Sequence, residues 1–204
     1  MVQQTGNKFD AIDSIDTARR IWEPIFAKYN LTKRGLLGEG YLFDGADYDA
    51  FIRQGPEQFI SQVPDLRSFL TSFPSHHRKV IFTNAPEASA RQILTLLGVD
   101  DVFEDVLGTD FLENKVCKPE RAAFEKVLTY LSVEPSSVCY FEDSFKNLMA
   151  GKELGMTTVF VTSSTLVNEG RLIEDLTQFD AVVENKVGWE LQSKIPKLWD
   201  ASNP

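Results

Sequence analysis

The feature that most constrains this sequence is a regular alternation of short apolar segments and amphipathic segments between residues 65 and 185. Apolar segments of strand length lie at 79–85, 105–110, 137–144, 157–164 and 180–185. Segments whose apolar residues have helical spacing lie at 65–73, 86–98, 119–131 and 145–155. Strands that alternate with helices in this way predict a parallel sheet covered by helices on both faces. We therefore assign residues 64–204 to an α/β core.

Residues 1–63 follow a different pattern. From Asp13 to Tyr29 the apolar side chains recur three and four positions apart, which predicts an amphipathic helix with Asp13 available as its N-cap. The stretch that follows is punctuated by glycine and suits short helices joined by turns. These residues predict a small helical lobe that precedes the α/β core.

Composition and charge exclude several classes of protein. Of the 204 residues, 43% are hydrophobic, and no stretch is long and apolar enough to span a bilayer. The formal net charge of −9 opposes binding to nucleic acid or to an anionic membrane surface. With only two cysteines, no CxxC spacing and no secretory leader, we expect a soluble cytoplasmic protein whose Cys117 and Cys139 act as small buried hydrophobes. The oligomeric state cannot be read from the sequence.

Polar residues follow three of the predicted strands. Thr83 and Asn84 end the first, and the adjacent acids Glu142 and Asp143 end the third. The loop after the second strand contains Lys118, followed by Pro119, at which we expect the next helix to begin. In open α/β sheets, ligands bind where the carboxyl ends of the strands lead into helices. These three ends together supply a hydroxyl group, backbone amides, a cation and two carboxylates.

Each of these residues also has a purely structural interpretation. Thr83 is a good helix N-cap, and a lone lysine such as Lys118 is usually a solvated surface charge. Glu142 and Asp143 could cap a helix that begins at Phe145, because acids at a helix N-terminus complement its dipole. A single cap at one strand end is readily explained in this way. Complementary groups at three such ends favour a functional site.

The chemistry that unites these groups is phosphoryl transfer. Mg²⁺ prefers oxygen ligands, commonly one or two carboxylates completed by water and a substrate phosphate. A lysine and donors from a hydroxyl group and backbone amides stabilise the negative charge of a transferring phosphoryl group. The sequence therefore predicts a site for Mg²⁺ and for a transferring phosphoryl group.

With VIFTNA, Lys118-Pro119 and YFEDSFKN in this order, the chain resembles the haloacid dehalogenase (HAD) superfamily of phosphatases. Within it, the chain is most similar to the pyrimidine 5′-nucleotidase-type branch, which carries a small helical cap after the first strand. The resemblance extends from about Asp13 to about Asn185. It implies a three-layer α/β/α Rossmann-like core over residues 64–204 and a helical cap lobe over residues 1–63.

The resemblance also implies roles for individual residues. Thr83 would bind phosphate with help from the backbone of Asn84, and Lys118 would screen the charge of the nucleophile and the phosphate. Asp143 would be a magnesium ligand, with Glu142 in direct or water-mediated contact with the metal. The residues expected to support this metal-binding loop are Ser144 and Asn147.

One motif of the family is missing from its expected place. The family's first strand ends in D-x-D-x-T or D-x-D-x-V, whose first aspartate attacks phosphorus, and no such string occurs here. The nearest string has Asp10, Asp13 and Asp16 three residues apart, which is the spacing of a helix face. We expect the motif to lie upstream of Met1, on a central strand between those that end at Thr83 and Asp143. A chain truncated in this way would be inactive as given and would expose two strand edges.

Two hypotheses follow. The first is a Mg²⁺-dependent phosphomonoesterase of small phosphorylated metabolites, with nucleoside monophosphates among the candidates. The second is a non-catalytic module that binds a phosphometabolite or a protein through the same pocket. A response-regulator or Rossmann nucleotide-binding domain shares the alternating pattern, but the sequence lacks a GxGxxG loop, and the GEG at 38–40 lies in the helical lobe.

Two further groups of residues are interpreted as structural. The aromatic residues of the helical lobe are expected to fill its core rather than to stack on a nucleotide base; they are Tyr41, Phe43, Tyr48 and Phe51. His76 and His77 precede the amino end of the first strand, away from the predicted site, and are expected at the surface.

Overall fold

The computed structural model describes residues 8–162, 167–168, 171–172, 176–184 and 188–200. The chain divides into two compact units, Met1–Phe59 and Ile60–Pro204, and each is described by itself. In the described part of the chain, every helix is too short or too polar to cross a lipid bilayer. The assignment of the first unit as a cap lobe stays a prediction.

The described part of the first unit is helical. Its elements are η1 (Lys8–Ala11), α1 (Ile15–Tyr29), α2 (Thr32–Gly38), α3 (Gly45–Ile52) and η2 (Pro56–Gln58). The helix expected after Asp13 is present, but its N-cap is Ser14, whose side chain accepts a hydrogen bond from the N–H of Thr17. Asp13 instead accepts a hydrogen bond from the Thr17 hydroxyl group, so its prediction as N-cap was wrong.

Aromatic side chains fill the core of the first unit. Tyr41 is buried with Ile25, and Phe43 and Tyr48 pack against them, which confirms their predicted role. Phe51 was wrongly predicted to join this core, because 72% of its surface is exposed. Helices α1 and α2 approach closely at Gly35, where an added Cβ would lie 2.3 Å from a side-chain carbon of Ile25.

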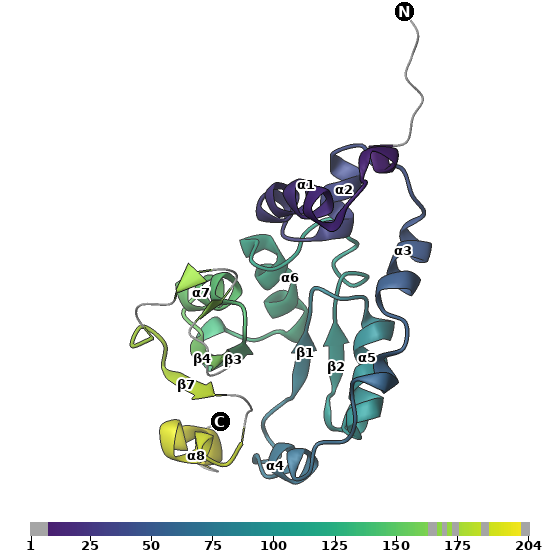
Figure 1. Cartoon of the computed structure of the whole chain (residues 1–204). Helices are drawn as coiled ribbons and strands as arrows, with labels where there is room; N and C mark the ends of the chain where they lie inside the picture. The colour runs from purple at the N-terminus through teal and green to yellow at the C-terminus, as the bar shows by residue number, and fades with distance from the viewer. Residues whose placement is uncertain (1–7, 163–166, 169–170, 173–175, 185–187, 201–204) are drawn as a thin grey trace, which may run out of the picture. The chain divides into compact units, whose positions relative to one another are not determined.

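The second unit contains the predicted alternation of strands and helices (Figure 1). Its helices are α4 (Leu66–Thr71), α5 (Glu87–Leu97), η3 (Asp100–Val102), α6 (Arg121–Leu131), η4 (Pro135–Ser137), α7 (Phe145–Glu153), α8 (Leu191–Lys194) and η5 (Pro196–Trp199). Its strands are β1 (Val80–Phe82), β2 (Asp105–Leu107), β3 (Cys139–Glu142), β4 (Thr157–Thr162), β5 (Val167–Asn168), β6 (Arg171–Leu172) and β7 (Ala181–Glu184). Helix α6 begins at Arg121 rather than at the predicted Pro119, since Glu120 occupies the N-cap position.

Strands β1, β2, β3, β4 and β7 pair in parallel, as predicted, but they form two separate sheets. Strands β1 and β2 pair with Phe82 opposite Leu107, and β3, β4 and β7 pair in that order. Strands β5 and β6 form a short antiparallel pair that the sequence did not predict. In the described residues no ladder joins β1 to β3, so each of these strands is at the edge of its sheet.

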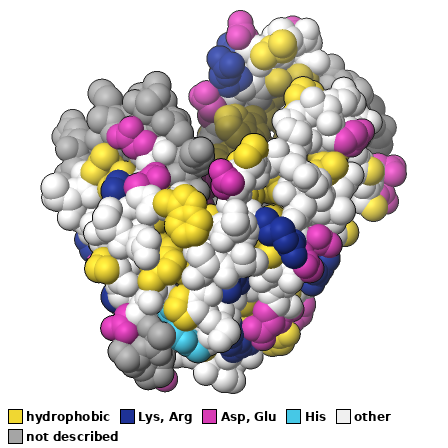
Figure 2. Space-filling view, turned by 90° about the horizontal axis from the view of Figure 1, so that it is seen from below, with side chains coloured by type: hydrophobic (Ala, Val, Ile, Leu, Met, Phe, Trp, Pro, Cys, Tyr) yellow, Lys and Arg dark blue, Asp and Glu magenta, His cyan; other side chains and the backbone are white. Residues whose placement is uncertain are grey.

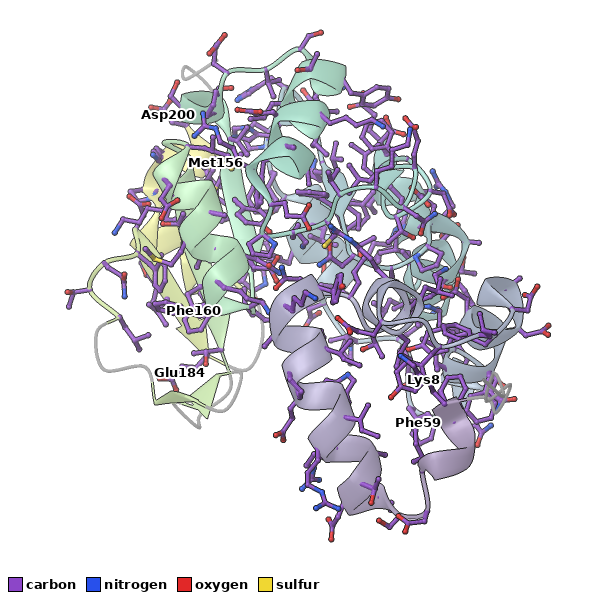
Figure 3. All side chains as sticks on the ribbon, turned by 90° about the horizontal axis from the view of Figure 1, so that it is seen from above. Lys8, Phe59, Met156, Phe160, Glu184 and Asp200 are labelled. Atoms are coloured by element: carbon purple, nitrogen blue, oxygen red, sulfur yellow. The ribbon has the colours of Figure 1, made fainter. Side chains whose placement is uncertain are left out.

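Apolar side chains cover both faces of the β3–β4–β7 sheet, as expected for a layered α/β unit. One face packs against α6 and α7 through Phe124, Tyr140, Leu148 and Phe160. The other face packs against α4 and α8 through Phe69, Val159, Val183 and Leu191. Phe160, labelled in Figure 3, is fully buried. Figure 2 shows acidic, basic and apolar side chains interspersed on one face of the described residues.

The predictions for the histidines and cysteines hold only in part. His76 is exposed, but His77 is half-buried. The Nε2 atom of His77 lies 2.9 Å from the carbonyl oxygen of Leu198. Burial lowers the pKa of His77. Cys117 is fully buried, and burial raises the pKa of the half-buried Cys139 to about 12, which makes it an unreactive thiol at neutral pH.

The side chain of Glu87 ties the loop after β2 to the start of α5. Its carboxylate accepts hydrogen bonds from the N–H groups of Gly108 and Phe111, each at 2.7 Å, and of Asp110 at 3.1 Å. The loop passes so close that a Cβ on Gly108 would lie 2.2 Å from the carbonyl oxygen of Ala85. Burial favours the neutral acid, but the hydrogen bonds from the backbone prevail and hold the pKa of Glu87 below its ordinary value.

Glu87→Gln is expected to lower the free energy of unfolding by about 1–2 kcal/mol at pH 7, because hydrogen bonds to a charged acceptor are the stronger ones. Since the pKa of Glu87 is lowered on folding, this contribution is present above the ordinary carboxyl pKa of 4.5 and is lost as the pH falls through the lower, folded value. Urea denaturation between pH 7 and pH 3 should show the difference from wild type narrowing with acid. Glu57→Gln, also in the first turn of a helical segment, is the control; a difference that persists at low pH would contradict the prediction.

Candidate functional site

Thr83 follows β1 and closes the turn that leads to α5. Its hydroxyl oxygen accepts a hydrogen bond from the N–H of Ala85 at 3.1 Å. The N-cap of α5 is Pro86, so the alternative interpretation of Thr83 as the cap of that helix was wrong. A hydroxyl group that accepts one hydrogen bond keeps its own O–H as a donor. Thr83 can therefore still donate to a ligand oxygen.

Asn84 pairs its side chain with the backbone of Lys118. The side-chain oxygen accepts a hydrogen bond from the Lys118 N–H at 2.9 Å, and the side-chain amide donates to the Lys118 carbonyl oxygen at 3.0 Å. The end of β1 thereby fixes the loop that carries the lysine. The predicted phosphate contact through the Asn84 backbone stays a prediction.

Lys118 is buried, with only 6% of its surface exposed, so the interpretation as a solvated surface charge was wrong. Its ammonium group donates to the carbonyl oxygen of Phe82 at 2.8 Å and to Oε2 of Glu142 at 2.6 Å. It also lies 5.1 Å from the ring centroid of Phe82 and 5.7 Å from that of Tyr140. Lys118 therefore bridges the ends of β1 and β3 and satisfies two of its three N–H donors there.

The carbonyl group of Phe82 is available to Lys118 because β1 has an unpaired edge. The N–H of Thr83 donates to the carbonyl oxygen of Leu107 on β2. Because the backbone N–H and C=O groups of successive residues point to opposite sides of a strand, the N–H and C=O groups of Phe82 face away from β2. Just before β3, the carbonyl oxygen of Val138 accepts a hydrogen bond from the N–H of Thr157. The backbone N–H and C=O groups of the next residue, Cys139, therefore face away from β4. The two sheets thus present backbone edges on which no ladder forms within the described residues.

Both oxygens of the Glu142 carboxylate have donors. Oε2 accepts from Lys118 and from the Tyr140 hydroxyl group at 2.5 Å, and Oε1 accepts from the Ser144 N–H at 3.1 Å. Burial opposes ionisation of Glu142, but the charge and hydrogen bond of Lys118, aided by Tyr140, hold its pKa below its ordinary value. Glu142 is therefore a carboxylate at neutral pH and the counter-ion of Lys118.

Asp143 has a different environment from its neighbour. Asp143 comes directly after β3, in the turn before α7, and is exposed. Desolvation of the carboxyl group, together with the hydrogen bond and negative charge of Glu142, raises its pKa. The charge of one acid therefore affects the ionisation of the other, and Glu142 loses its proton at a lower pH than Asp143.

Ser144 and Asn147 shape the turn after these acids. Ser144 is the N-cap of α7, and its side-chain oxygen accepts from the N–H of Asn147 at 3.5 Å. The interpretation of Glu142 and Asp143 as caps of this helix was therefore wrong. Asn147 is buried, and its side-chain oxygen has no hydrogen-bond partner among the described residues.

The donor set at this turn suits a hard cation such as Mg²⁺. It comprises the carboxylates of Glu142 and Asp143, and the buried side-chain oxygen of Asn147, which has no hydrogen-bond partner among the described residues, lies one helical turn further along the chain. No group of three or more His, Cys, Asp or Glu residues suited to a metal occurs in the part of the chain that the structure describes. Mg²⁺ commonly binds to only one or two carboxylates and completes its shell with water and phosphate oxygens. The residues present therefore fit Mg²⁺ with part of its coordination left to water and phosphate.

Tyr140 is the site residue that sequence reasoning missed. It precedes Glu142 by two positions on β3, and side chains two apart on a strand lie on the same face. This spacing was the available signal, but an isolated tyrosine in an apolar run is equally well explained as core.

The fold and the site define a Rossmann-like α/β protein with a lysine–carboxylate centre at the carboxyl ends of its strands. The sequence profile of the haloacid dehalogenase-like hydrolases matches residues 43–161. The chain belongs to this family of hydrolases. The expected nucleotidase-type branch and the missing first motif stay predictions.

Named relatives agree with this assignment. A phosphoglycolate phosphatase of Psychrobacter arcticus is 28% identical over 135 residues, which are 66% of this chain and 56% of the relative. A validoxylamine A 7′-phosphate phosphatase of Streptomyces hygroscopicus is 28% identical over 102 residues, 48% of this chain and 47% of the relative. The chain thus spans about half the length of the curated relatives it matches.

Two solved structures share the fold at lower sequence identity. The HAD phosphatase of Thermococcus onnurineus superposes with a TM-score of 0.58 at 20% identity, over 87% of this chain and 79% of that structure. The L-2-haloacid dehalogenase of Xanthobacter autotrophicus superposes with a TM-score of 0.54 at 18% identity, over 81% of this chain and 77% of that structure. At these identities the likeness establishes the fold alone.

Proposed function

We propose that this chain forms the phosphate- and metal-binding part of a Mg²⁺-dependent phosphomonoesterase that acts on a small phosphorylated metabolite. The single observation that carries this proposal is the buried contact between Lys118 and Glu142, which places a cation beside two adjacent acids at the ends of β1 and β3. The relatives support the reaction class, because their names denote phosphatases of small molecules. The net charge of −9 favours a small substrate over nucleic acid.

The residues of the chain have separable roles in this reaction. Thr83 donates its O–H to a phosphate oxygen, and Lys118 supplies positive charge that balances the negative charge of the phosphoryl group. Asp143, Glu142 and Asn147 would hold the metal. When bound, Mg²⁺ polarises the phosphoryl group and neutralises developing charge. The attacking carboxylate expected from the family resemblance is not identified in the 204 residues, so turnover is proposed for the whole protein.

A second candidate function is a non-catalytic module that binds phosphate. It is favoured by the lack of a D-x-D-x-T string in the sequence. This module would bind metal and phosphate without hydrolysing a phosphate ester. The phosphatase would bind them and also hydrolyse the ester.

Asp143→Asn is expected to weaken the binding of Mn²⁺, a spectroscopic substitute for Mg²⁺, at least tenfold, because it removes a carboxylate from the metal site. Isothermal titration calorimetry of the full chain measures this affinity, with Asp100→Asn in η3 as the matched control. Hydrolysis of an aryl phosphate by the whole protein that carries the attacking carboxylate, lost in Asp143→Asn, selects the phosphatase over the binding module. Wild-type protein that binds no Mn²⁺, or an Asp143→Asn variant that binds it equally well, contradicts the metal site.

A further inference from the structure

We propose that Tyr140 is a positioning residue, which fixes the orientation of the Glu142 carboxylate and, through it, the place of Lys118. Its hydroxyl group and the Lys118 ammonium group donate to the same oxygen, Oε2 of Glu142, at 2.5 Å and 2.6 Å. The backbone N–H of Ser144 donates to the other oxygen. Two donors that flank Glu142 in the sequence and one from a distant loop therefore define both the plane and the rotation of this carboxylate.

The ring of Tyr140 is itself held in place. It is 9% exposed, and the ring of Phe124 packs perpendicular to it at a centroid distance of 5.6 Å. Helix α7 passes beside it at Gly151, where a Cβ would lie only 2.6 Å from Cδ1 of the tyrosine. Because Phe124 and Gly151 bound the ring, the hydroxyl oxygen occupies a defined position next to Glu142.

A buried tyrosine hydroxyl group needs a hydrogen-bond partner, and any nearby carbonyl group could satisfy it. Here the partner is instead the carboxylate of a buried ion pair, whose two side chains are only 8% and 6% exposed. Such a pair is stable only when the remaining lone pairs of the carboxylate also have donors. Tyr140 supplies one of these donors on the oxygen that faces Lys118, which keeps the opposite oxygen directed to the turn of Asp143.

Two consequences follow from removal of this hydroxyl group. The Glu142 carboxylate gains freedom to rotate, so the donor set at the turn becomes less well ordered for a metal. Lys118 also loses a carboxylate held at a fixed place, so its ammonium group becomes more mobile. The first consequence rests on the proposed function, and the second does not.

Tyr140→Phe retains the ring and deletes only the hydroxyl group. We expect the Mn²⁺ affinity of the full chain to fall about tenfold, as is usual when a hydrogen bond to a metal-site carboxylate is removed. The same substitution in a Glu142→Gln background should give no further loss, because Tyr140 acts through that carboxylate. Tyr130→Phe is the matched control, since it removes a hydrogen bond to Asp105 on the exposed side of β2.

A second measurement is independent of any metal. Competitive acetylation with isotopically labelled acetic anhydride, read by mass spectrometry, reports the reactivity of Lys118, with Lys126 as the internal reference. We expect the rate of acetylation of Lys118 to rise several-fold in Tyr140→Phe and not to rise in Tyr130→Phe. Gly151→Ala, which displaces the tyrosine ring but leaves its hydroxyl group intact, should shift the Lys118 rate in the same direction.

The outcomes separate this inference from the proposed function. A change in either readout that vanishes in the Glu142→Gln background supports the positioning role. Wild-type protein that binds no Mn²⁺ but shows the rise in Lys118 reactivity contradicts the metal site and supports the role of Tyr140. Unchanged values in both readouts, or a change that persists in the Glu142→Gln background, overturn the inference.

Discussion

Lys118→Met is expected to lower the free energy of unfolding by about 3–5 kcal/mol, the usual cost of removing one partner of a buried ion pair. The substitution leaves the Glu142 carboxylate buried, with 6% of its side chain exposed, and takes away the donor at 2.6 Å. It also leaves the carbonyl group of Phe82 without the N–H that binds it. Urea denaturation followed by circular dichroism measures the change.

The double variant Lys118→Met/Glu142→Leu tests whether this loss comes from the uncompensated charge. We expect it to recover most of the stability, because an apolar pair avoids the cost of burying either ion. Lys126→Met is the matched control, since Lys126 pairs with Glu113 on the surface and its loss should have little effect. A Lys118→Met variant as stable as this control would show that the buried pair does not form.

Phe124→Ala is expected to lower the free energy of unfolding by about 3–5 kcal/mol, as large-to-small changes in a packed core do. Phe124 lies on α6, is 1% exposed and packs edge-on against Phe82 at 5.2 Å and Tyr140 at 5.6 Å. These two rings belong to β1 and β3, and both flank the ammonium group of Lys118. The cavity would therefore loosen the contact between the two sheets as well as the core.

The same denaturation experiment measures Phe124→Ala, with Phe51→Ala as the control of equal chemistry. Phe51 is 72% exposed, so its truncation should change the stability by no more than about 0.5 kcal/mol. We also expect Phe124→Ala to raise the acetylation rate of Lys118, because both neighbouring rings lose their support. Equal effects of the two truncations would contradict the central packing role of Phe124.

The sequence alone was sufficient for the class of fold, because the periodicity of apolar residues reports which faces of each element are buried. The strand that leads to Thr83 and the strand that leads to Glu142 were both located in this way. Helix starts were less predictable, with Ser14 rather than Asp13 as the cap of α1 and Arg121 rather than Pro119 as the first residue of α6. Neighbouring residues can cap a helix almost equally well, so the local backbone decides among them.

Some features of the candidate site could likewise be predicted from the sequence, and others depended on the tertiary structure. Thr83, Lys118 and Glu142 could be proposed from their places after strands, because the carboxyl ends of parallel strands lie at one edge of a sheet. Only the tertiary structure decided that Lys118 is buried against Glu142, 24 residues away, and that Asn84 pairs with the Lys118 backbone, 34 residues away. It alone also placed the Tyr140 hydroxyl group on the same carboxylate oxygen. Periodicity records the burial of each side chain within its own element, whereas hydrogen bonds between distant loops depend on how the elements pack.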